Sequence, residues 1–396
     1  TKLNQQTAYE ENLQAKASVF PTLSAGASTS FVNKKTLNST TENYEYNQSF
    51  TNSYSLNSSM NLFNGFKTKN NIEQQKLYLK TSDLAVKEAE NNIEIAITEA
   101  YLQILFVKES VKTAELNLEV SKTQMERGKI LYEAGSIAQS DYAQLESEFF
   151  NENYQLVVAK NNFESQVLTF KQLLELGIND TINLYYPEIS DENVVSLLSS
   201  KEEIYNTSLS FLPQIESGKI DVQAAEYDLK KAKGSLYPSL NLNASVSTGY
   251  ADADNEIYFN QLNNNLYESI GLSLSFTIFN QRETRTSISK SKIAIENAKL
   301  NSISIEKDLL KTVETVYLNV VSAQNRFLAA KESLKSAKIS YELTKEKYNL
   351  GMKNTFEFLS EKNNYLNAQQ EYLQAKYASI LNQKLLDFYQ NKTIDL

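Results

Sequence analysis

Two short segments of the sequence each place a glycine a few residues before an acidic side chain. They run Tyr132-Glu-Ala-Gly-Ser-Ile-Ala-Gln-Ser-Asp141 and Tyr348-Asn-Leu-Gly-Met-Lys-Asn-Thr-Phe-Glu357. Carboxylate, lysine and tyrosine side chains can form ion pairs and hydrogen bonds with one another. Because the first turn of a helix favours acids through the helix dipole, ordinary helix-start charges remain an alternative interpretation of Asp141 and Glu357.

Most other site chemistry is excluded by composition. The chain has no Cys and no His, which excludes the usual zinc sites, thiol catalysis and Ser-His-Asp triads. No glycine-rich phosphate loop is present, and the net charge of −9 argues against a nucleic-acid partner. We therefore expect no enzyme, no cofactor and no metal site.

The elements around these segments are predicted to be very long helices. Neither Gly nor Pro occurs in 66–127, in 136–176, in 272–350 or from residue 352 to the end. Apolar positions such as Ile93, Ile97, Ala100 and Ile104 recur in steps of 4 and 3, which is typical of coiled-coil packing. A helix from 66 to 133 would be roughly 100 Å long.

The two halves of the chain match at a fixed offset of 216 residues. Tyr101-Leu102 matches Tyr317-Leu318, and the tyrosine and glycine of one segment above match those of the other. We therefore predict one structural unit used twice. The first unit is 1–210, with a helix, strands at 21–33 and 52–64, a helical hairpin at 66–176 and a segment at 177–210. The second is 211–396, with a helix, strands at 238–250 and 269–280, and a hairpin at 281–396.

Four stretches have no charged residue and alternate between apolar and small polar side chains. They are 21–33, 46–66, 235–251 and 269–281, and the connections 34–51 and 251–268 are interpreted as long extracellular loops. Such alternation over about 10 residues is the signature of outer-membrane strands, with one face toward lipid and the other toward a wet lumen. A soluble sandwich is the alternative. The sequence contains no run of about 18 apolar residues, so no transmembrane helix is predicted.

Four strands leave two unpaired edges, which a bilayer does not tolerate, so the chain is expected to share its strands with copies of itself. At this point the sequence resembles the TolC-like outer-membrane efflux family over nearly its whole length. The resemblance is carried by the tandem repeat, by Phe20-Pro21 and Tyr237-Pro238 before strands, and by the two glycine segments. It implies a mainly α-helical fold, with four strands per chain completed as a twelve-stranded barrel in a homotrimer.

The same resemblance implies an exit duct of a tripartite efflux or secretion system. It would lie in the bacterial outer membrane with its helical part in the periplasm. Its partners would be a periplasmic adaptor (membrane fusion) protein, outer-membrane lipid and, indirectly, an inner-membrane transporter. It implies an equatorial region formed by about 177–212 together with the C-terminus. Because Thr1 is not a start Met, a processed or trimmed N-terminus is expected.

The resemblance also implies roles for the two hairpin tips. Asp141, Tyr348, Lys353 and Glu357 become candidates for a lock at the periplasmic entrance. Gly135, Ser136, Gly351 and Met352 become hairpin-tip residues that contact the adaptor. Family members often have two acidic positions three apart in the second tip, whereas Ser360 occupies the second of them here.

Two non-channel functions remain as alternatives. A structural coiled-coil or fibre-forming protein would be soluble without detergent, and the charge-free alternating strands argue against it. A periplasmic adaptor also has a helical hairpin, but it would have one hairpin and soluble β domains.

Overall fold

The computed structural model describes residues 1–394 except 38, 39, 41, 188 and 255. The chain divides into two compact units, one formed by 1–87 with 213–304 and the other by 88–212 with 305–396. The long helices α2 (Lys67–Glu133) and α7 (Glu283–Asn349) contribute residues to both units. Within the described part of the chain, no helix combines the length and apolar character needed to cross a membrane.

The order of elements repeats along the chain. The first series is α1 (Lys2–Ala17), β1 (Thr22–Leu37), β2 (Tyr44–Phe63), α2 and α3 (Gln139–Leu173). The second is α5 (Pro213–Gly234), β3 (Ser239–Ala251), α6 (Tyr258–Asn264), β4 (Tyr267–Ser275), α7 and α8 (Thr355–Tyr389). Between them lie a 3-10 turn η1 (Asp191–Asn193) and α4 (Lys201–Phe211).

The long helices match in length as well as in order. Helices α2 and α7 have 67 residues each, and α3 and α8 have 35 each. From Lys67 to Glu283 is 283 − 67 = 216 residues, and from Gln139 to Thr355 is 355 − 139 = 216, the offset of the sequence repeat. The repeat in the sequence is therefore a repeat of helices, while the division of the chain at residue 210 stays a prediction.

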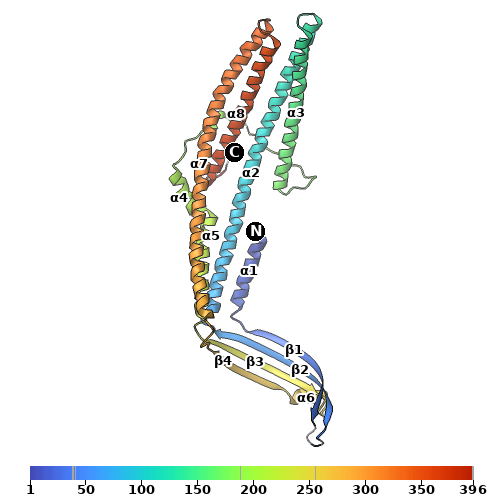
Figure 1. Ribbon diagram of the computed structural model, residues 1–396, viewed down its shortest axis with the longest axis vertical. Coiled ribbons are helices and arrows are strands. Elements are labelled where there is room, and N and C mark those ends of the chain that lie inside the picture. The colour runs from blue at the N-terminus through green and yellow to red at the C-terminus, as the bar shows by residue number, and fades with distance from the viewer. Residues whose placement is uncertain (38–39, 41, 188, 255, 395–396) are drawn as a thin grey trace. The chain divides into compact units, whose positions relative to one another are not determined.

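The four strands form one antiparallel sheet in the order β1-β2-β3-β4 (Figure 1). Its register aligns apolar residues on one face, where Leu56 pairs with Val246, Leu242 with Leu272 and Leu240 with Leu274. Small polar residues align on the other face, where Asn61 donates a hydrogen bond to Asn241 at 2.9 Å. The predicted two-faced strands are confirmed.

The predicted connections differ from the structure in three places. Residues 34–37 and 44–51 belong to β1 and β2, so the prediction of a loop over 34–51 was wrong for most of its length. The observed strands extend past the charge-free stretches to include Lys34, Lys35 and Glu45, because only the part of a strand inside a bilayer needs to be free of charge. The connection 251–268 contains the helix α6 and the start of β4.

Strand β4 is shorter than predicted. It ends at Ser275, which pairs with Ser239, the first residue of β3. Beyond this pair no described strand of the same chain lies beside residues 276–280, so a ladder cannot continue there. Phe276 and Ile278 nevertheless continue the alternation of the apolar face and are strongly exposed.

The second unit has a small hydrophobic core between its long helices. Leu102 and Leu105 of α2, Phe327 of α7 and Ile380 of α8 are buried together with Val194, which follows η1. Figure 1 shows α2 with α3 and α7 with α8 as two long hairpins. The segment around η1 therefore packs as a side layer on the helices, within the range predicted as the equatorial region.

Candidate functional site

Both helical hairpins end in the same hydrogen-bonded turn. Gly135 has φ of 70°, its N–H donates to the Tyr132 carbonyl at 2.9 Å, and the Ser136 N–H donates to the Leu131 carbonyl at 2.8 Å. In the second tip Gly351 has φ of 72°, and two equivalent bonds of 3.0 and 2.9 Å are made by Gly351 and Met352. This is the Schellman ending of a helix, which needs a residue that tolerates positive φ.

The second tip begins its return helix with a complete capping box. The side chain of Asn354 accepts from the Glu357 N–H at 2.8 Å, and the Glu357 carboxylate accepts from the Asn354 N–H at 3.2 Å. Lys353 also forms an ion pair with Glu357. The hydrogen bond from Lys353, and then that from the Asn354 backbone, lower the pKa of Glu357. The carboxylate is thus held ionised within its own tip.

The first tip has the same backbone but fewer side-chain contacts. Its N-cap residue is Ala138, which has no side chain that could cap α3. Asp141 lies in the first turn of α3 and is half-buried. Among the described residues, no hydrogen bond or ion pair joins Asp141 to Tyr348, Lys353 or Glu357. The structure therefore brings three of the four predicted lock residues into one tip and leaves Asp141 in the other.

Each tip is closed by a pair of stacked aromatic rings. Tyr132 and Tyr142 stack with centroids 5.7 Å apart, and Tyr348 stacks on the buried Phe358 at 4.7 Å. The Tyr348 hydroxyl lies 3.5 Å from the Thr355 hydroxyl and not beside an acid. Sequence reasoning missed these pairs, although the offset of 216 aligns Tyr142 with Phe358.

The outer surface of the second tip is apolar. Leu350, Met352 and Phe356 expose 75%, 69% and 71% of their side chains respectively. These residues flank Gly351, and the predicted adaptor-contact residues Gly135, Ser136 and Met352 are all exposed. An exposed apolar tip rimmed by charged groups is typical of a protein-binding surface.

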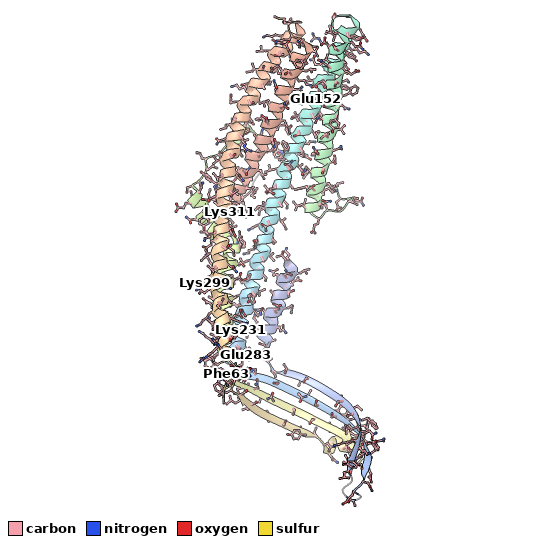
Figure 2. The ribbon with its side chains drawn as sticks, viewed as in Figure 1. Phe63, Glu152, Lys231, Glu283, Lys299 and Lys311 are labelled. Atoms are coloured by element: carbon pink, nitrogen blue, oxygen red, sulfur yellow. The ribbon has the colours of Figure 1, made fainter. Side chains whose placement is uncertain are left out.

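A buried group of charges joins the two hairpins. The ammonium of Lys362 on α8 lies 2.8 Å from the Glu148 carboxylate and 2.9 Å from the Glu152 carboxylate, both on α3. The exposed fractions of the three side chains are 3%, 12% and 5%. Figure 2 labels Glu152 on α3. We call these residues the α3–α8 ion triad, and sequence reasoning did not identify it.

A second charged cluster holds the segment around η1 to the helices. Asp191 forms ion pairs with Lys331 at 2.9 Å and Lys376 at 3.1 Å, and it accepts from the Tyr372 hydroxyl at 2.6 Å. Burial alone would raise the pKa of Asp191, but the bonds from Tyr372, Lys331 and Lys376 outweigh it and lower that pKa to about 2. The cluster docks the segment around η1 onto α7 and α8.

These groups can form ion pairs and cap helices, and they do not converge on a reaction centre. Among the residues that the structure describes, no group of three or more acidic side chains is placed to hold a metal ion.

Comparison with known proteins agrees with this arrangement. The family model described as outer membrane efflux protein matches residues 1–175 and 204–389. The outer membrane efflux protein BepC of Brucella suis is 21% identical over 80% of this chain, which spans 67% of BepC. The pyoverdine export outer membrane protein OpmQ of Pseudomonas aeruginosa is 22% identical over 76% of this chain, which spans 62% of OpmQ.

The fold is also that of a solved outer-membrane protein. The structure of VceC from Vibrio cholerae superimposes with a TM-score of 0.79 at 14% identity, covering 100% of this chain and 92% of that one. At 14% identity the structural likeness shows the fold alone. The match to the family model over most of the chain shows the family. The chain belongs to the outer membrane efflux protein family, and it is located in the outer membrane with its helical part in the periplasm.

Proposed function

We propose that this chain, as an outer-membrane efflux duct, works as a homotrimer that receives its cargo from a periplasmic adaptor and an inner-membrane transporter. The observation that carries the proposal is the sheet, whose edge strands β1 and β4 each have one neighbour within the chain and whose apolar face is exposed. A bilayer requires every edge to be paired, so strands of other copies must complete the barrel. Three copies would supply twelve strands.

Two further features support the assembly. Phe276 and Ile278 continue the apolar alternation of β4 where no described strand of this chain lies beside them, and β1 of a neighbouring copy would supply a partner strand. Between α7 and α8 lies a groove of about 610 Å³ lined largely by small side chains, including Ala323, Ala330 and Ala375. Small side chains let a helix backbone approach closely, so a helix of a second copy fits this surface.

The function requires a conducting trimer that depends on detergent or lipid. We expect native mass measurement in detergent to give three chains, and planar bilayers to show single-channel conductance. A stable monomer that is soluble without detergent would overturn the proposal in favour of a fibre-forming or adaptor protein. The proposal includes passive conduction without catalysis, and the cargo is a small molecule or exported substrate.

The lock at the entrance is proposed to depend mainly on the pair between Lys353 and Glu357. If the second tips of the three copies meet near the axis of the trimer, their Glu357 carboxylates gather there. Lys353 of each copy then neutralises its own Glu357. Lys353→Ser is expected to raise conductance because the freed carboxylates repel one another. Adding Tyr348→Phe should change little more, since the ring stack survives. Single-channel recording measures both effects.

Matched variants separate this lock from general surface charge. Lys347→Ser removes the same charge from an exposed site one residue before Tyr348 and should leave conductance unchanged. Glu357→Ala should weaken block by multivalent cations, which an acidic ring attracts, and Asp141→Ala should have a smaller effect. Equal conductance in Lys353→Ser and the unmodified trimer, at normal trimer yield, would place the lock elsewhere.

A further inference from the structure

The short helix α6 packs on the apolar face of the sheet. The Tyr258 hydroxyl lies 2.7 Å from the Tyr54 hydroxyl, and its ring centroid is 5.0 Å from that of Tyr250. Thr248 donates a hydrogen bond to the Leu262 carbonyl. Tyr54 pairs with Thr248, two positions along from the pair of Leu56 and Val246, so all these contacts are on the face that carries the leucines.

The position of α6 is fixed by one buried side chain. Gln261, which is 1% exposed, accepts from the Ala251 N–H at 2.9 Å and donates to the carbonyls of Asp254 and Glu256 at 3.2 and 2.8 Å. Asn265 adds a bond of 2.9 Å to the Gly249 carbonyl. The helix is therefore attached to the end of β3 through several backbone groups.

The exposed side of α6 is uncharged, and it presents Phe259 together with the asparagines at 260, 263 and 264. Phe259 and Ile257 expose 77% and 67% of their side chains. No charged residue occurs from 257 to 267, although Asp252, Asp254 and Glu256 precede this stretch and Glu268 follows it. A helix that faced only water would gain nothing from these exposed apolar side chains.

The depth of α6 follows from the register of the sheet. The exposed apolar stripe that begins at Ile270 of β4 and continues past the end of this strand to Ile278 spans nine residues, the length of a tilted membrane strand. Glu268 lies just beyond it, paired with Val246. The contacts of α6 with Thr248 and Tyr250 lie two and four residues farther along β3. The α6 contacts with Thr248 and Tyr250 therefore lie at the boundary between the hydrocarbon core and the lipid headgroups.

We propose that α6 is an interfacial anchor that inserts Phe259 and Ile257 between the headgroups of the outer leaflet. The occupant is membrane lipid, because the surface of α6 continues the lipid-facing side of the sheet at the level where aromatic residues favour the interface. The proposal rests on the insertion of the sheet in the outer membrane. The loop between β3 and β4 thus supplies part of the aromatic girdle that strands usually provide.

The absence of Trp from the chain allows a direct test with single-tryptophan variants. Phe259→Trp reports on α6, Leu274→Trp on the middle of the apolar stripe, and Ala253→Trp on the exposed loop before α6. Each trimer is placed in phosphatidylcholine vesicles whose acyl chains carry bromine either near the headgroups or near the bilayer centre. Tryptophan fluorescence is measured with these quenchers and with aqueous iodide.

We expect Phe259→Trp to be quenched more strongly by shallow bromine than by deep bromine. Leu274→Trp should show the opposite preference, and Ala253→Trp should respond mainly to iodide. If Phe259→Trp behaves like Ala253→Trp while Leu274→Trp is quenched by bromine, α6 is not an interfacial anchor. The insertion of the sheet in the membrane would still be supported. Stronger quenching of Phe259→Trp by deep bromine also overturns the interfacial position. Loss of bromine quenching at Leu274→Trp would instead contradict the proposed barrel.

Discussion

Leu272→Arg is expected to prevent stable insertion of the trimer, whereas Ser273→Arg, one residue along the same strand, is expected to insert. Leu272 is 67% exposed and pairs with Leu242 on the apolar face. A cation near the middle of a lipid-facing strand costs about 2–4 kcal/mol, and three copies would cost about 6–12 kcal/mol per trimer. Ser273 pairs with Asn241 on the polar face, where water can solvate the guanidinium.

The measurement is the fraction of each variant recovered as trimer in outer membranes, followed by bilayer recording of what inserts. We expect Ser273→Arg to keep a normal trimer yield and to shift ion selectivity toward anions, because its charge lies in the lumen. Leu274→Arg should repeat the defect of Leu272→Arg. Equal loss from Leu272→Arg and Ser273→Arg would mean that the two faces of the sheet do not separate lipid from lumen.

The faces and the helices could be predicted because their signals are local. The alternation that places Leu272 and Ser273 on opposite faces is a property of consecutive residues. The two long helices end at Gly135 and Gly351 because a single residue with positive φ completes each Schellman turn. The capping box of the second tip is likewise visible as Asn354 followed three residues later by Glu357.

The charged contacts between segments could not be predicted in the same way. Asp191 and Tyr372 are 181 residues apart, and the pairing depends on where the segment after α3 packs on α8. The repeat gives no help with the α3–α8 ion triad, because the offset aligns Lys362 with Glu146, Glu148 with Asn364 and Glu152 with Ala368. The triad thus has no counterpart at the matching positions of the repeat, and 22% of the residues in the chain are charged and offer many possible partners.

The α3–α8 ion triad provides the second large effect, on the stability of the helical unit. Lys362→Met keeps a long side chain but leaves Glu148 and Glu152 buried without a counter-charge. Removing one partner of a buried ion pair typically costs about 3–5 kcal/mol, because the remaining charge stays out of water. We expect a loss of that size in denaturant unfolding of the trimer, with faster hydrogen exchange in α3 and α8.

A matched surface pair shows whether burial is the cause. Lys160 and Glu115 form an ion pair of 3.1 Å between α3 and α2, but both side chains are more than half exposed, at 54% and 52%. Lys160→Met should therefore cost at most about 1 kcal/mol. A similar small loss in Lys362→Met would mean that water reaches the triad.

Two further conditions should restore the Lys362→Met variant if unpaired negative charge is what destabilises it. Adding Glu148→Gln and Glu152→Gln removes the charges and should recover most of the lost stability, since neutral groups are much less costly to bury.

Lowering the pH should also restore stability to the Lys362→Met variant. Burial without a cation raises the pKa of a carboxyl above its unfolded value, so the folded state binds more protons and becomes more stable as the pH falls. The unmodified trimer, in which Lys362 holds both carboxylates, should not gain stability over the same range. If lowering the pH does not reduce the difference in unfolding free energy between Lys362→Met and the unmodified trimer, the triad acts through packing and not through charge.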